Sequence, residues 1–139
     1  MSRIYLLAAD KPLPLCDFQE MREHQIDGNL IVFAAGFAVS KLEYYREAVE
    51  ELELPLKPYR YGLSLEHRGA DLRRLTDYLR ENLLPGEEVE LCALWLGGGP
   101  GKLRRYRGTL EELDMDALGM LFEGDRLFED GQVCLTVMA

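Results

Sequence analysis

The sequence has no long apolar run, and this lack excludes a membrane-spanning helix of ordinary length. Its longest apolar stretch, residues 30–39, is interrupted by Gly36 and ends at Ser40. The first ten residues contain one basic residue and a short apolar run, which does not match a secretory signal sequence. We therefore expect the mature protein to begin at this N-terminus, to act in the cytoplasm and to have no membrane partner.

Cysteine and histidine are both scarce. The three cysteines, Cys16, Cys92 and Cys134, lie far apart and form no C-x-x-C pair, and two histidines do not complete a usual zinc set. We therefore assign no metal site and no cofactor. Cys92 and Cys134 lie within apolar, strand-like runs, so we expect both to be small buried hydrophobic residues in a reducing compartment.

Familiar catalytic motifs are also missing. The sequence contains neither a serine-centred nucleophile elbow nor an H-E-x-x-H metalloprotease motif. Glu66, His67 and Arg68 form a cluster that can exchange protons, but adjacent residues on an extended chain point to opposite faces. We therefore assign no catalytic residue, expect His67 to be a surface or capping residue, and favour a protein without enzymatic activity.

The spacing of apolar residues predicts a mixture of helices and strands. The length of 139 residues and the hydrophobic content of 47% suit one globular domain covering residues 1–139. The patterns predict strands at residues 3–9, 30–35, 59–65, 89–96, 102–107 and 133–138, and helices at residues 17–26, 41–52, 70–83 and 109–122. We expect an α+β fold with a single mixed β-sheet of about five or six strands and three or four helices packed on it. A three-layer α/β fold with a mostly parallel sheet is the alternative.

Two segments before residue 40 carry specific predictions. The sequence Asp17-Phe18-Gln19-Glu20 has the form of a capping box, so a helix is expected to begin there and to stop at Gly28. Residues 30–35 are apolar on both faces, which is the pattern of a strand in the centre of a sheet. Together the segments predict a short helix, with Phe18 and Met21 facing inward, followed by a buried strand.

The charge is distributed unevenly. The formal net charge is −9, yet residues 102–107 contain four basic residues and no acidic one. They follow a glycine-rich stretch whose backbone N–H groups suit an anion. A phosphate-binding P-loop is not matched, because Leu103 stands where a hydroxyl side chain belongs. The candidate ligand-binding residues are Gly97, Gly98, Gly99, Gly101, Lys102, Arg104, Arg105 and Arg107.

The same stretch also has a purely structural interpretation. Glycine and proline form hairpin turns, and basic residues on an edge strand discourage pairing with other sheets. Residues 102–107 would then pair back on the preceding strand, with Lys102 and Arg104 on one face and Arg105 and Arg107 on the other. In that arrangement the four charges would not converge on one ligand.

These features favour a small acidic protein with a non-catalytic role in protein–protein interaction or regulation. Its partner is expected to be another protein or a second copy, in which an acidic surface meets the basic residues 102–107. The alternative is a binder of, or an enzyme acting on, a small anionic ligand held by residues 97–102 and the neighbouring arginines. Nucleic acid is disfavoured, since a net charge of −9 repels phosphate backbones.

Overall fold

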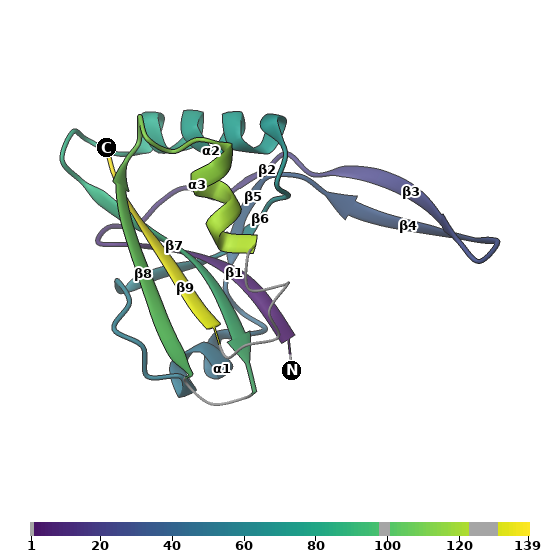
Figure 1. Cartoon of the computed structure of the whole chain (residues 1–139), viewed down its shortest axis with the longest axis horizontal. Helices are drawn as coiled ribbons and strands as arrows, with labels where there is room; N and C mark the ends of the chain where they lie inside the picture. Colours follow the sequence, from purple (N-terminus) through teal and green to yellow (C-terminus); the bar gives the residue numbers. More distant parts are fainter. Residues whose placement is uncertain (1, 98–100, 123–130) are drawn as a thin grey trace.

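The computed structural model describes residues 2–97, 101–122 and 131–139, and strands dominate it. Strands account for 46% of the structure and helices for 22%. A seven-stranded mixed sheet forms the body, and a two-stranded hairpin extends from it as an arm (Figure 1). The expected α+β fold, with one sheet of five or six strands and three or four helices packed on it, is therefore wrong. The mostly parallel alternative is wrong as well, because one strand pairing among the described residues is parallel and the others are antiparallel.

The strands of the body lie in the order β2-β5-β6-β1-β7-β9-β8. Their bounds are β1 Ser2–Ala9, β2 Cys16–Asp17, β5 Ala38–Lys41, β6 Tyr59–Ser64, β7 Glu88–Leu96, β8 Lys102–Thr109 and β9 Gly131–Met138. The arm consists of β3, Glu20–Ile26, and β4, Asn29–Ala35, which pair with each other as a separate two-stranded sheet.

Helices cover the two faces of the body sheet unequally. On one face pack α2 (Gly69–Asn82), α3 (Met115–Gly119) and the 3-10 helix η1 (Met120–Phe122), and Leu75 and Leu79 of α2 are fully buried there. On the other face α1 (Arg46–Glu51) buries Val49 against β1 and β7. The predicted helix at residues 70–83 is confirmed, because its leucines recur at the spacing that turns one stripe toward a core.

The other predicted helices are much shorter than expected. Residues 38–41 complete strand β5, so α1 begins only at Arg46. Thr109 and Glu112 do form reciprocal hydrogen bonds, but they close a turn, and α3 starts later, where Asp114 accepts a hydrogen bond from the backbone N–H of Ala117 at 2.8 Å. A capping pattern thus marks a hydrogen-bonded turn without guaranteeing a helix after it. No helix in the described part of the chain is long and apolar enough to cross a membrane.

The predicted hairpin between residues 89–96 and 102–107 is wrong. Strand β9 lies between β7 and β8, antiparallel to the first and parallel to the second (Figure 1). The physical reason lies in β9, whose residues from Gly131 to Val137 are all buried. A strand that is apolar on both faces requires neighbours on both sides, whereas the basic β8 suits an edge.

The predicted helix at residues 17–26 is also wrong, because this segment forms the first half of the arm. Asp27 and Gly28 have φ values of 50° and 79°, the left-handed pair of a type I′ turn between two strands. Asp17 accepts a hydrogen bond from the backbone N–H of Gln19 at 2.8 Å, so its carboxylate closes a short turn instead of a capping box. Residues 30–35 do form a strand, but of β4 only Ala35 is buried, so β4 is not a central strand.

Candidate functional site

The predicted basic residues lie on β8, the outermost strand of the body (Figure 1). Gly97 and Gly101, on either side of the β7–β8 connection, have φ values of 87° and 60°, which glycine adopts without strain. Gly98 and Gly99 lie outside the described residues. Because β8 is a strand, its side chains alternate between two faces, and the four cations are divided between them.

Arg105 is held within the body by a buried carboxylate. Its Nη1 donates to Glu90 Oε2 at 3.0 Å and its Nη2 to the carbonyl oxygen of Pro55 at 2.9 Å. Glu90 is only 5% exposed, and its other oxygen accepts a hydrogen bond from the backbone N–H of Lys57 at 2.6 Å. Arg105 and Glu90 therefore fasten the loop after α1 to the edge of the sheet, and an anionic ligand would have to compete with this carboxylate.

The remaining cations of β8 are not gathered into one site. Arg107 forms an ion pair with Glu88 of β7. Lys102 is exposed next to Gly101, and Arg104 is half-buried on the same face of the strand. Two of the four predicted ligand-binding cations, Arg105 and Arg107, thus form ion pairs within the molecule.

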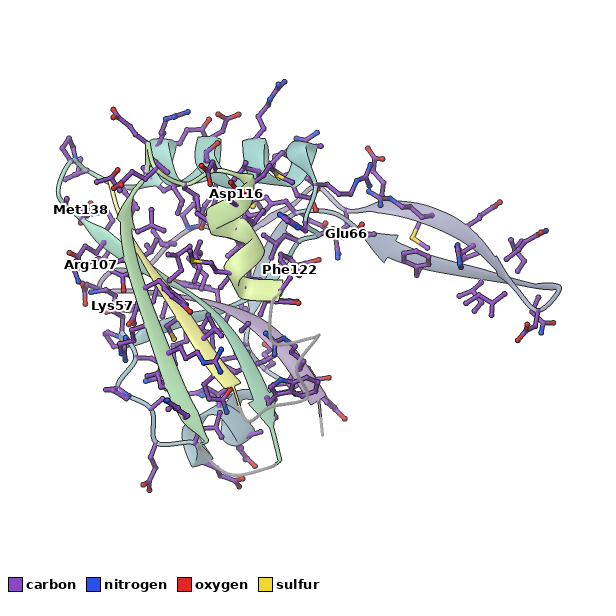
Figure 2. All side chains as sticks on the ribbon, viewed as in Figure 1. Lys57, Glu66, Arg107, Asp116, Phe122 and Met138 are labelled. Atoms are coloured by element: carbon purple, nitrogen blue, oxygen red, sulfur yellow. The ribbon has the colours of Figure 1, made fainter. Side chains whose placement is uncertain are left out.

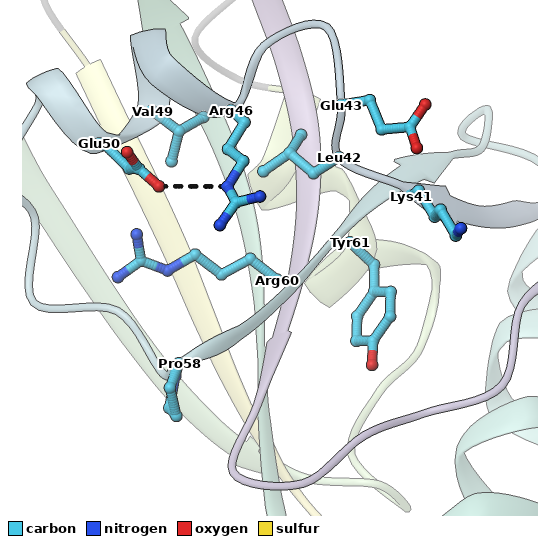
Figure 3. Close-up of a pocket in the computed structure, with 9 residues that line it drawn as sticks. All are labelled: Lys41, Leu42, Glu43, Arg46, Val49, Glu50, Pro58, Arg60 and Tyr61. Atoms are coloured by element: carbon cyan, nitrogen blue, oxygen red, sulfur yellow. Dashed lines mark hydrogen bonds and ion pairs between the residues drawn. The ribbon is translucent and has the colours of Figure 1, made fainter.

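A pocket of about 360 Å³ lies beside α1, on the opposite side of the sheet from α2 (Figure 3). Arg46 and Arg60 extend across it (Figure 3). Arg46 Nε pairs with Glu50 Oε1 at 3.3 Å, and Arg60 donates to the carbonyl oxygens of Lys57 and Leu56 at 3.0 and 3.2 Å. The lining residues are Lys41, Leu42, Glu43, Arg46, Val49, Glu50, Pro58, Arg60 and Tyr61. The volume suits a small ligand, but cations and carboxylates alternate along the walls, so the pocket favours neither sign of charge.

Groups with shifted pKa values do not converge on an acid–base site. Burial raises the pKa of the Tyr78 hydroxyl, which donates to the carbonyl oxygen of Pro14 at 2.7 Å. Burial and the neighbouring Cys134 thiol, 2.7 Å away, raise the pKa of Cys92 well above its usual value. A hydrogen bond from Lys11 lowers the pKa of Glu87. Within the described ranges no cluster of three or more His, Cys, Asp or Glu residues suits a metal ion.

His67 has a structural role at the start of α2. Its Nε2 lies 2.6 Å from the carbonyl oxygen of Met115, and its ring stacks on Phe122 with 5.5 Å between centroids. A Cβ at Gly119 would come within 3.1 Å of the imidazole, so α3 approaches this ring closely. His67 therefore joins the loop before α2 to α3, which agrees with its predicted role at the surface.

The arm carries the largest group of exposed apolar side chains among the described residues. These six side chains are between 42% and 68% exposed: Met21, Ile26, Leu30, Ile31, Val32 and Phe33. The sticks in Figure 2 project from both faces of the arm, away from the body. Together they present apolar surface on the order of 600 Å², divided between the two faces of the arm, which compares with the largest patches found on ordinary monomers.

The two strands of the arm differ sharply in composition. β4 has the sequence NLIVFAA, with no charged residue and apolar side chains on both faces. β3 has the sequence EMREHQI, with polar residues at five of its seven positions. The hairpin therefore has one polar and one apolar outer edge, and its apolar side chains are concentrated on β4.

The base of the arm is fixed to the body. Arg22 donates from Nη1 to both carboxylate oxygens of Glu66, at 3.0 and 3.1 Å, and Glu66 lies where the arm joins the body (Figure 2). The backbone N–H of Phe18 donates to the carbonyl oxygen of Phe37 at 2.8 Å, which continues the β2–β5 pairing toward the arm. These contacts hold the direction of the hairpin at its base.

The sequence contains a local signal for this arm that has two interpretations. An Asp-Gly pair between two strand-like runs is one of the strongest local indications of a two-residue hairpin, and Asp27-Gly28 is such a pair. The same pair also fits the end of a helix, which is the interpretation that the capping-box pattern at Asp17 favours. The exposed residues of β3 and β4 are therefore absent from the predicted site.

Comparisons with protein-family models, with curated proteins and with solved structures found no match for this chain.

Proposed function

We propose that the protein is a non-catalytic protein–protein interaction module and that the β3–β4 arm is its docking element. The observation that carries this proposal is the exposure of β4. A strand that is apolar on both faces normally lies inside a sheet or a sandwich, whereas β4 is exposed on both faces and, within the described ranges, pairs with a strand along one edge alone.

Three properties of the arm support docking over a merely structural role. Its apolar side chains contribute little to the two core clusters, which are built from the body. Its polar partner strand β3 keeps the hairpin paired, and its base is anchored by Arg22 and Glu66. The arm therefore presents an apolar strand in a fixed direction, which lowers the conformational entropy that a partner must overcome on binding.

A site-specific photo-crosslinker in the natural host cell tests this proposal. We would place the photoreactive residue at His24 on β3, which leaves β4 unchanged, and a matched one at Glu81 on the exposed side of α2. We expect a discrete protein adduct from position 24 and none from position 81. Absence of any adduct from position 24, with the protein folded and abundant, would contradict the proposed function.

A cytoplasmic site of action is part of this proposal. It is supported by the state of the cysteines, which are free thiols, with Cys92 and Cys134 buried on facing strands. Fractionation of the host cell tests it directly, and recovery of the protein from an oxidising compartment with these thiols joined would count against it.

A small anionic ligand held near Lys102 is the second candidate function. It is supported by the exposure of Lys102 beside Gly101, which has the left-handed backbone conformation found in anion-binding turns. Titration with phosphate and nucleotides, followed by Trp95 fluorescence and thermal stability, is expected to show saturable binding that Lys102→Ala removes. A flat response to each anion would leave the docking proposal alone.

A further inference from the structure

We infer that the partner of the arm is a second copy of this chain, with two β4 strands pairing edge to edge, antiparallel, about a twofold axis at Val32. This inference depends on the proposed docking function and names its partner. The product would be a continuous four-stranded ribbon in the order β3-β4-β4-β3, with the two apolar strands in the centre.

The backbone of β4 is already arranged for this pairing. In a hairpin with a two-residue turn, the residues that flank the turn, Ile26 and Asn29, form a hydrogen-bonded pair. The alternation then directs the N–H and C=O groups of Leu30, Val32 and Ala34 away from β3, toward the outer edge. A twofold axis at Val32 places Val32 opposite Val32 of the second copy and Leu30 opposite its Ala34. This register forms about six interchain hydrogen bonds.

The side chains of β4 also complement one another in this register. Leu30 lies opposite Ala34 of the second copy, a large residue against a small one, and Ile31 lies opposite Phe33. Pairs of an aromatic and a β-branched residue on directly opposed strands are among the favourable cross-strand contacts. No like charges meet, because β4 contains no charged residue.

The length of the unoccupied edge matches one further strand. In the body, β5 pairs with β6, and this ladder ends at Ala38 and Ser64. Among the described residues β4, which continues the direction of β5, pairs with β3 and with no other strand, so its second edge carries no strand partner. A second β4, also of seven residues, would pair along this edge beyond the end of β6.

The charges at the ends of that edge are balanced. In this register the turn of one arm, with the exposed carboxylate of Asp27, reaches the segment that follows β6 in the second copy. There Arg22 and Arg68 both lie within 4.0 Å of the carboxylate of Glu66, and the buried carboxylate of Asp71 accepts a hydrogen bond from the backbone N–H of Glu66 at 2.6 Å. The two cations therefore already face two carboxylates, and the two bodies, each in a chain of net charge −9, stay at opposite ends of the ribbon.

The apolar surface area of the two arms limits the expected affinity of the dimer. Two arms present apolar surface on the order of 1,200 Å², and even complete burial would reach only the lower limit of specific interfaces. We therefore expect a reversible dimer with a dissociation constant in the micromolar range.

The experiment is sedimentation equilibrium of the full chain from low micromolar to millimolar concentration. We expect a shift from 15.9 kDa toward twice that mass. Val32→Lys sets two like charges against each other at the axis and should weaken the dimer at least tenfold. Gln25→Lys is the matched control, since it adds the same charge to the same face of the arm but on β3, and it should leave the mass unchanged.

Cysteine cross-linking provides an independent test of the dimer if Val32→Lys disturbs the fold. In a Cys16→Ser background, Val32→Cys should be joined to its counterpart by a short bismaleimide, and Gln25→Cys should not. A strictly monomeric wild-type chain at every concentration would overturn the inference, as would a Val32→Lys variant that dimerises like the wild type. If the crosslinker at position 24 nevertheless captures a different protein, the docking function stands and only the identity of the partner is wrong.

Discussion

Two of the outer strand edges in the described structure, those of β8 and β4, have opposite character. β8 carries basic side chains, and two of them are tied to Glu88 and Glu90 of the same sheet. β4 carries no charge, and four of its seven residues are large apolar residues that are between 42% and 57% exposed. Under the proposed function, the charges of β8 protect its edge against strand pairing, whereas the uncharged edge of β4 is open to it.

The two regions also differ in what fixes their position. β8 lies beside β9, which is buried throughout, and its arginines hold the neighbouring loop. The arm is attached to the body through its base and has few contacts elsewhere along its length. A change in β8 should therefore alter stability, whereas a change in β4 should alter association.

Removing the arm gives the largest expected change in association. We would replace residues 20–35 with Asn-Gly, the preferred two-residue turn, between Gln19 and Gly36. Self-association should be lost completely, while cooperative thermal unfolding of the body persists. Unfolding of the shortened chain, with the wild type stable under the same conditions, would show that the arm is part of the core and would break the comparison.

A matched pair of truncations compares stability in the two regions. Leu135→Ala in β9 removes a side chain that is 4% exposed and should cost about 2–5 kcal/mol of unfolding free energy. Val32→Ala in β4 should change it by less than about 0.5 kcal/mol, since Val32 is half-exposed. Urea unfolding at a concentration where the chain is monomeric measures both. Equal losses would contradict the assignment of β4 to a docking role.

Glu90→Gln tests the internal neutralisation of β8. The substitution keeps the size of the side chain but weakens its bonds to Arg105 and to the backbone of Lys57. We expect a loss of about 1–3 kcal/mol in unfolding free energy, because the guanidinium of Arg105 and the backbone N–H of Lys57 both lose a buried, charged hydrogen-bond acceptor. Arg46→Gln, which breaks an exposed pair with Glu50, is the control and should have little effect. An unchanged stability of Glu90→Gln would mean that Arg105 is available to a ligand.

The smallest effect is a pH dependence at the end of β8. The hydrogen bond from the backbone N–H of Thr109 lowers the pKa of Glu112 below its ordinary value of 4.5. The folded state therefore binds fewer protons than the unfolded state near that pH, so this stabilisation is present above pH 4.5 and declines as the pH falls. Glu112→Gln should flatten the corresponding part of the stability profile between about pH 5 and pH 3. An identical profile in both proteins would contradict the proposed shift.

Local patterns accounted for the elements that have one clear apolar stripe or are apolar throughout. The leucine stripe of α2 and the apolar run of β7 predicted both elements correctly. The arm was missed because Asp27-Gly28 fits either the end of a helix or a hairpin, and only pairing of β3 with β4 distinguishes them. The place of β9 between β7 and β8 depends on contacts between distant segments, which periodicity does not encode.

In the candidate site, too, local patterns predicted the strands but not which strands became neighbours. The sequence correctly predicted that residues 102–107 would form a strand and that residues 30–35 would form a strand, but the expected central position of residues 30–35 was wrong. It did not indicate that Glu88 and Glu90 would meet the arginines, or that β4 would leave the body, because both depend on which strands become neighbours.

The central claim is that the outer edge of β4, and not that of β8, forms intermolecular strand pairs. Hydrogen exchange of the backbone amides, measured by NMR at low and at high protein concentration, tests it most directly. We predict that the amides of Leu30, Val32 and Ala34 become protected as concentration rises while those of β8 do not change. Rapid exchange of the Val32 amide at every concentration, or new protection confined to β8, would contradict the claim.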